Sequence, residues 1–295
     1  NTYHPFEIII CLTNMGDAKN IDPDDIKQLN ILCIDIECEC ENGFPEPIDA
    51  EEKVNAITMK LFGHDTIHVI GTDNFDFKTD NPNIKYHKCQ HEKQLLKTFM
   101  KVWNELNPDI VTGWNVETFD MAYLINRIWK LFSWDTATKL SPHNLLTSRE
   151  WFYMGQKKQI AYNISGVATL DYLQMYKKFT YTDQESFTLD NIAFVELGTK
   201  KDPNPYDTFK EWYTKDYQSF IDYNIKDVEI VDALEDKMKL IELALTMAYE
   251  AKANYTDVFS QVRMWDVTIY NFLKDMNIVV PSRKVVSQAE RYEGA

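Results

Sequence analysis

The sequence predicts an α/β protein built on a mixed sheet that is flanked by helices. Strand-like apolar runs come before the first segment with helical periodicity, and helix and strand candidates then alternate along the chain. This order of elements is typical of an α/β fold. With 295 residues, of which 44% are hydrophobic, the chain can bury the core that such a fold needs.

The first part of the chain contains short apolar runs separated by polar loops. FEIIICL (6–12) is a strand candidate, and a polar loop follows at 15–25. ILCIDIEC (31–38) is expected to be a strand buried on both faces, because its apolar run is almost continuous. After a turn-rich loop, VNAITMKLF (54–62) and TIHVIG (66–71) are the next two predicted strands.

Helices enter the pattern after about residue 90. Leu95, Phe99, Val102 and Leu106 recur at helical spacing within residues 91–107, and Pro108 ends that helix. The remaining predicted elements are a strand at 109–114, a helix at 119–132, a hairpin at 151–166 that turns near Gly155, a strand at 167–173 and a long helix at roughly 217–250.

Charge and composition narrow the functional classes. The chain has 31 basic and 46 acidic residues, a net charge of −15, which argues against a broad phosphate-binding surface. The negative net charge remains compatible with a narrow site in which metal ions supply the positive charge. The five cysteines form no CxxC pair and are expected to be reduced thiols, with a zinc site on Cys38 and Cys40 as the alternative. No apolar run approaches the ~18 residues of a membrane span.

Two acids lie within the second apolar run, at 31–38. Asp35 and Glu37 are two apart, so on a strand they point to the same face, while Ile34 and Ile36 point to the core. A carboxylate beside a core costs several kcal/mol, on the order of the burial penalties known for charges, unless something compensates it. Taken alone, the pair is also compatible with a solvent-facing strand end.

Two further segments carry acids at element boundaries. Asp120 stands where the helix at 119–132 begins, and a favourable first-turn acid is the simpler interpretation. Tyr223 and Asp227 are four residues apart on a predicted helix and therefore share a face. A core tyrosine beside a surface acid is the simpler interpretation there.

Together, Asp35, Glu37, Asp120 and Asp227 form a set of four acids on separate elements of one fold. Converging carboxylates repel one another unless some are protonated or cations bind. Hard oxygen ligands suit Mg²⁺ or Mn²⁺, and two such ions can act on the attacking and leaving oxygens of a phosphodiester. Tyr223, one turn before Asp227, can orient the attacking water. The pattern predicts a two-metal site.

The same residues resemble a known family. DIE (35–37), WNVETFD (114–120) and YNIKD (223–227) are similar to the three exonuclease motifs of family B DNA polymerases, particularly the replicative polymerases of T-even-like bacteriophages. Residues 164–198 look like the segment between the second and third motifs. RMWDVTIYNFLK (263–274) and the closing YEGA look like the lead-in to the polymerase palm.

The resemblance implies a ribonuclease-H-like fold that removes nucleotides from the 3′ end of single-stranded or frayed DNA. It implies that the four acids Asp35, Glu37, Asp120 and Asp227 bind two divalent metal ions and that Tyr223 helps to position the water. We expect Asp35 and Asp120 to hold the metals, Asp227 to complete the first metal site, and Glu37 and Tyr223 to orient the water. Residues that would bind the DNA end are Phe44, Asn115, Phe119, Thr188 and Leu189. Aromatic and apolar side chains of this kind can stack on unpaired bases, although each is also compatible with ordinary packing.

The resemblance also implies an organisation for the chain. Residues 1–29 would be part of a small N-terminal domain, 30–240 the exonuclease domain, 241–282 a return segment packed on the N-terminal part, and 283–295 the lead-in to a palm. The hairpin around Gly155, with Lys157 and Lys158, matches a strand-separating hairpin in position. Palm motifs are absent from this sequence, so the chain is expected to be a fragment or one half of a split polymerase.

The expected partners are a single-stranded or primer–template DNA and a polymerase palm and thumb region or chain. The expected location is that of a bacteriophage protein in the host cytoplasm. Two other functions remain open. The chain can serve as a docking module for a separate polymerase chain with weak intrinsic hydrolysis, or as an RNA-cleaving ribonuclease of the same fold. The complete set of motif acids favours the DNA exonuclease over the docking module, and the polymerase-like matches outside the motifs favour it over the ribonuclease.

Overall fold

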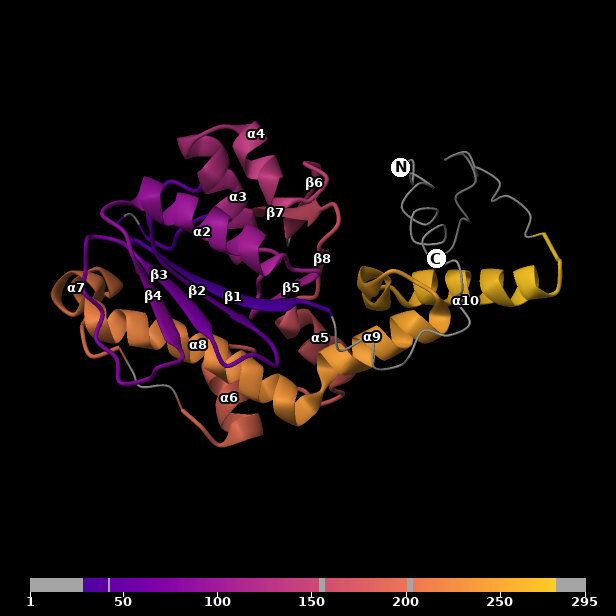
Figure 1. Ribbon diagram of the computed structural model, residues 1–295. Helices are drawn as coiled ribbons and strands as arrows, with labels where there is room; N and C mark the ends of the chain where they lie inside the picture. Colours follow the sequence, from indigo (N-terminus) through magenta and orange to yellow (C-terminus); the bar gives the residue numbers. More distant parts are fainter. Residues whose placement is uncertain (1–28, 42, 154–156, 201–203, 280–295) are drawn as a thin grey trace.

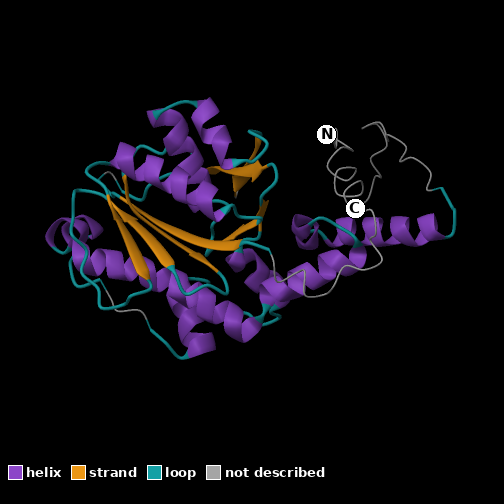
Figure 2. Ribbon diagram, viewed as in Figure 1, coloured by secondary structure: helices purple, strands orange, loops and turns teal. Residues whose placement is uncertain are grey.

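The computed structural model describes residues 29–41, 43–153, 157–200 and 204–279. A central sheet lies between helices on both sides, and the last two helices extend away from it (Figures 1 and 2). The segments 6–12 and 15–25, Gly155, and the lead-in 283–295 lie outside the described residues.

The central sheet is mixed, as predicted. Its strand order is β4-β3-β2-β1-β5-β8, with β1 antiparallel to β2, β2 antiparallel to β3, and the other pairs parallel. The strands are β1 Ile31–Cys38, β2 Val54–Leu61, β3 Ile67–Gly71, β4 Ile84–Lys88, β5 Ile110–Thr112 and β8 Ala168–Thr169. A separate hairpin pairs β6 Leu146–Tyr153 with β7 Lys157–Ile164.

The helices cover both faces of the sheet. Helices α2 and α3 pack with Leu32, Ile34 and Ile36 on one face, and α8 packs on the other face, toward which Cys33 points. The α-helices are α2 Glu92–Leu106, α3 Asp120–Leu131, α4 Trp134–Ala137, α5 Tyr172–Phe179, α6 Leu189–Leu197, α7 Phe209–Lys215, α8 Tyr217–Met238, α9 Leu240–Ala251 and α10 Gln261–Asp275. Two 3₁₀ turns are η2 Thr138–Leu140 and η3 Tyr255–Phe259.

Most predicted elements agree with the structure to within a few residues. β1, β2, β3, α2 and α3 match their predicted ranges, and β5 is shorter than predicted. In β1, Ile31, Asp35 and Glu37 are half-buried while the other residues are buried, so the strand is not buried evenly on both faces. The predicted hairpin is present, although β6 begins five residues earlier, at Leu146 rather than 151.

Two predicted elements were wrong. The long helix at 217–250 is two helices, because Lys239 adopts a left-handed conformation with φ 55° and the Glu235 carboxylate accepts from the N–H groups of Ile241 and Glu242. Because the apolar residues keep their helical spacing through Lys239, the sequence pattern did not indicate the end of α8. The strand at 167–173 is only β8, because Asp171 caps α5 by accepting from the N–H of Gln174.

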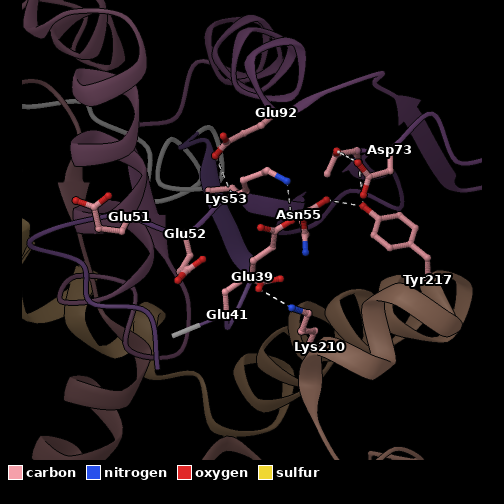
Figure 3. Close-up of polar contacts among 12 residues, drawn as sticks. Glu39, Glu41, Glu51, Glu52, Lys53, Asn55, Asp73, Glu92, Lys210 and Tyr217 are labelled. Carbon is pink, nitrogen blue, oxygen red and sulfur yellow. Dashed lines mark hydrogen bonds and ion pairs between the residues drawn. The ribbon is translucent and has the colours of Figure 1, made fainter. Parts of the chain in front are cut away.

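A buried ion pair between α2 and α3 also binds the segment between β1 and β2. Glu92 and Arg127 form two hydrogen bonds of 2.7 Å, and both side chains are more than nine-tenths buried. Glu92 also accepts from the N–H of Val54, while Arg127 donates to the carbonyls of Ala50 and Glu51. Each charge therefore has several partners, and the start of β2 is fixed relative to α2 and α3. Figure 3 shows the hydrogen bond between Glu92 and the start of β2.

The other face of β2 is tied to helix α8. The Tyr217 hydroxyl donates to the carbonyl of Asn55 at 2.5 Å and accepts from the N–H of Thr72 at 2.9 Å (Figure 3). Tyr217 is the first residue of α8, so these bonds anchor the beginning of that helix. Helix α8 then packs across β1 and β2, and this packing brings Asn224 and Asp227 close to Asp35 on β1.

Removing one member of the buried ion pair should destabilise the fold. Arg127→Met leaves the Glu92 carboxylate buried without its counter-charge, and we expect the free energy of unfolding to fall by about 3–5 kcal/mol. Urea unfolding followed by circular dichroism measures this.

Lys101→Met is the matched control, because Lys101 pairs with Glu105 on the exposed face of α2. Its expected cost is below about 1 kcal/mol. Similar losses in the two variants would show that burial does not govern the strength of the Glu92–Arg127 pair.

Candidate active site

Three acids from two elements converge on the α8 side of the sheet. The carboxylates of Asp35 and Glu37 on β1 and Asp227 on α8 each offer an oxygen, and these oxygens lie within 4.8 Å of one another. Asp227 is buried, while Asp35 and Glu37 are half-buried. Strand alternation explains why Asp35 and Glu37 point together, and the packing of α8 on β1 brings in Asp227.

Asp120 lies beside this cluster but outside the group of three. It is the first residue of α3, is 2% exposed, and accepts a hydrogen bond of 3.0 Å from the N–H of Ile36. Ile36 stands between Asp35 and Glu37, so this bond joins the start of α3 to the centre of the acidic strand. Burial, together with the charges of Asp171 and Asp227, raises the pKa of Asp120 to about 7, although the hydrogen bond from the N–H of Ile36 acts in the opposite direction.

The Asp35 carboxylate has a partner that the sequence did not indicate. The Nδ2 of Asn224 donates to Asp35 Oδ2 at 2.6 Å, and Asn224 Oδ1 accepts from the Thr58 hydroxyl at 2.5 Å. Thr58 is the residue of β2 directly opposite Asp35. Asn224 is next to Tyr223 in the sequence, but its contact with Asp35 depends on how α8 packs across the sheet.

Tyr223 lies one turn before Asp227 on α8, as predicted. Its ring packs against Trp212 and Phe209, with centroids 5.0 and 6.3 Å away. Burial raises the pKa of Tyr223 above its ordinary value, and the charges of Asp227, Glu37 and Asp35 act in the same direction. The hydroxyl therefore keeps its proton at neutral pH and can donate a hydrogen bond.

The loop between β5 and α3 is held at several points. Asp171, 1% exposed, accepts from the N–H of Glu117 at 3.0 Å, and burial raises its pKa to about 6. A Cβ at Gly113 would lie 2.4 Å from the carbonyl oxygen of Ile34, so only glycine allows this approach to β1. Within the loop, Asn115 has φ 67° and its side chain accepts from the Thr118 hydroxyl.

The residues predicted to bind DNA fall into two groups. Phe44 is 73% exposed and its ring centroid lies 5.4 Å from that of Phe119, which directly precedes Asp120. Asn115 lies in the same loop as Phe119. Thr188 and Leu189 begin α6, where Thr188 caps the helix by accepting from the N–H of Asn191 and Leu189 is 7% exposed in the core.

The β6–β7 hairpin contacts the same loop. Arg149 on β6 forms an ion pair of 2.6 Å with Glu117, and its guanidinium lies 5.3 Å from the ring centroid of Trp151. Phe152 is 68% exposed. Lys158 pairs with Glu150 across the hairpin, and Lys157 is the first residue of β7.

The donor set of the cluster suits a hard cation. Its members offer carboxylate oxygens, the ligands that Mg²⁺ and Mn²⁺ prefer. Bound cations would reduce the repulsion from Asp227, which adds to the effect of burial in raising the pKa of Asp120. Within the described part of the chain the clustered metal ligands include no cysteine, and burial raises the pKa of Cys38 and Cys40, which keeps these thiols protonated. These findings favour carboxylate coordination over the zinc alternative.

Comparisons with known proteins identify the class of this fold and site. The family described as "DNA polymerase family B, exonuclease domain" matches residues 7–192. The fold is therefore that of a polymerase exonuclease domain, and the chain belongs to DNA polymerase family B.

Individual relatives agree with this assignment. The DNA-directed DNA polymerase of Escherichia phage RB69 is 34% identical over 87% of this chain, and that of Enterobacteria phage T4 is 31% identical over 88%. The DNA polymerase delta catalytic subunit of Schizosaccharomyces pombe is 25% identical over 90%. The matched region is 31% of each phage polymerase, so the chain spans about a third of their length. Among the described residues, no helix is long and apolar enough to cross a membrane.

The stability of the metal-free protein should depend on Asp120. Its pKa is about 7 in the folded chain against an ordinary 3.8, so folding holds its proton more tightly and stability falls as the pH rises through this window. Asp120→Asn keeps an oxygen for the Ile36 N–H but cannot ionise. In EDTA, we expect this variant to lose less stability than the wild type between about pH 5 and about pH 8.

Urea unfolding at the two pH values measures the difference. Some pH dependence should remain in the variant below about pH 6, because Asp171 also has a raised pKa. Equal losses in wild type and variant would mean that Asp120 is ionised without penalty in the folded chain.

Proposed function

We propose that this chain is a metal-dependent 3′→5′ DNA exonuclease, the proofreading portion of a family B replicative polymerase. The observation that carries the proposal is the convergence of Asp35, Glu37 and Asp227 within 4.8 Å, on a fold that belongs to this family. The buried Asp120 beside them supplies a fourth carboxylate.

We infer that Asp35, Glu37, Asp120 and Asp227 hold two divalent ions, Mg²⁺ or Mn²⁺. When bound, such ions activate a water and stabilise the attacking and leaving oxygens of a phosphodiester displacement. Glu37 and Tyr223 orient the water in this proposal. The support for Tyr223 is its protonated hydroxyl, one helical turn from Asp227.

The substrate we propose is the 3′ end of single-stranded or frayed DNA. Phe44 and Phe119 form an aromatic pair, and Phe119 directly precedes Asp120. The exposed ring of Phe44 can stack on an unpaired base of any sequence. Asn115 and Thr188 would contact the strand from the neighbouring loop and from the start of α6, with Leu189 packed beneath. The β6–β7 hairpin, with Arg149 and Trp151 on β6, would lie against the duplex side.

A docking role is the second candidate function, and helix α10 favours it. Val262, Trp265, Ile269 and Phe272 are each at least 49% exposed and recur at helical spacing, so they form one apolar stripe. We propose that residues 241–282 pack on residues 1–29 as a return segment, beside a polymerase palm and thumb that completes the enzyme. Similarity to phage polymerases supports a phage protein that acts in the host cytoplasm.

The test is degradation of a 5′-labelled single-stranded DNA with Mg²⁺ and with EDTA. Asp35→Ala should lower the rate on the order of 10³-fold or more, because the metal site is lost. A ladder that shortens from the 3′ end, is absent in EDTA and is weaker on RNA of equal length is the expected result.

Asp65→Ala is the control, because Asp65 is an exposed acid between β2 and β3 and stands outside the cluster. It should keep the wild-type rate. Hydrolysis by Asp35→Ala at the wild-type rate would rule out the site, and folded wild-type protein without hydrolysis would favour the docking role.

Tyr223→Phe tests the role of the hydroxyl alone. The ring packing against Trp212 and Phe209 is retained in this variant, and so are the four acids. We expect a loss of about 10- to 100-fold in kcat, smaller than that of Asp35→Ala, with little change in Mn²⁺ affinity. A loss as large as that of Asp35→Ala would show that Tyr223 has another role.

A further inference from the structure

A pair of buried polar side chains connects the first acid of the cluster to two other elements. Asn224 is fully buried on α8, and it bridges Asp35 on β1 and Thr58 on β2. Thr58 is also fully buried. Neither residue belongs to the set of acids and the tyrosine to which the proposed reaction assigns roles.

The chemistry of the three groups fixes the direction of both hydrogen bonds. An ionised carboxylate only accepts, so the amide must turn its Nδ2 toward Asp35, at 2.6 Å. Asn224 Oδ1 then faces Thr58, and the hydroxyl donates to it at 2.5 Å. A flipped amide would place two acceptors together at Asp35. The Thr58 hydroxyl therefore selects the amide orientation that Asp35 needs.

The bridge also restricts the Asp35 carboxylate. The terminal torsion of an aspartate is broad, so a carboxylate on a strand can rotate unless something holds it. Thr58 is opposite Asp35 in the β1–β2 register, and Asn224 is on the same helix as Asp227, three residues earlier. One hydrogen-bonded chain thus sets the orientation of Asp35 relative to the helix that carries the third acid of the cluster.

We propose that Thr58 and Asn224 are positioning residues that hold the Asp35 carboxylate in the orientation that binds the divalent cation. This inference rests on the proposed function, because it concerns the same metal site. Partners that orient a metal ligand typically affect metal affinity or activity by about 10- to 100-fold when they are removed. A purely structural pair would affect stability only.

The test compares four variants of the full chain. Thr58→Val removes the hydroxyl and keeps the shape, whereas Thr58→Ser keeps the hydroxyl. Thr112→Val is the matched control, because Thr112 is also fully buried in the sheet and donates a hydrogen bond of 2.6 Å, but to the carbonyl of Leu170. Asn224→Ser shortens the bridge so that it no longer spans both partners, and it serves as the second variant should Thr58→Val fail to fold.

Two readouts separate positioning from stability. Mn²⁺ binding is titrated by electron paramagnetic resonance without DNA, and kcat and KM are measured on single-stranded DNA. For Thr58→Val and Asn224→Ser, we expect the Mn²⁺ dissociation constant to rise about 10- to 100-fold and kcat at fixed Mn²⁺ to fall, with KM for DNA unchanged. Thr58→Ser should restore both values, and Thr112→Val should leave both unchanged.

The outcomes distinguish this inference from the proposed function. Wild-type Mn²⁺ affinity and kcat in Thr58→Val, together with their loss in Asp35→Ala, would overturn the positioning role and leave the metal site intact. Equal losses in Thr58→Val and Thr112→Val would show a general effect of buried hydroxyls and would also overturn it. A wild type that neither binds Mn²⁺ nor hydrolyses DNA would overturn the proposed function itself.

Discussion

Like-charge repulsion around β1 is the constraint on which the rest of the site depends. Asp35, Glu37 and Asp227 hold oxygens within 4.8 Å of one another, and Asp120 lies beside them with a pKa raised to about 7. A folded domain is stable by only about 5–15 kcal/mol, so such a cluster needs local compensation. The fold provides it with two donors: the backbone N–H of Ile36 for Asp120 and the amide of Asn224 for Asp35.

Buried polar groups outside the cluster hold the loops that flank it. Asp171, at the start of α5, accepts from Glu117 in the loop that leads to Asp120. The Glu92–Arg127 pair fixes the segment that follows β1, just beyond the exposed Phe44. These residues are not members of the cluster, yet they fix the loops that flank it. The aromatic pair of Phe44 and Phe119 joins the two loops.

The sequence predicted those features that depend on residues close together in the chain, and it missed those that depend on residues far apart in the chain. Local periodicity was sufficient for β1, α2 and α3. The motifs taken together selected four acids, of which the structure brings three within 4.8 Å of one another and places Asp120 beside them. The bonds of Asn224 to Thr58 and Asp35 join residues 166 and 189 positions apart, so strand register and helix packing had to be known first. The break at Lys239 depends on the hydrogen bond that the Glu235 carboxylate accepts from the N–H of Ile241. Helical periodicity carries no information about that bond.

Net charge and site chemistry together explain how an acidic chain can act on DNA. A chain with a net charge of −15 repels a polyanion at long range, and screening shortens that repulsion to about 8 Å at physiological ionic strength. In the proposed function, contact with the strand would come from uncharged groups, such as the exposed ring of Phe44, and from cations held by the carboxylates. The acids that make the surface unfavourable for duplex DNA are thus the groups that make a narrow metal-dependent site favourable. Under the proposed function, affinity for a long duplex would come from other parts of a complete polymerase.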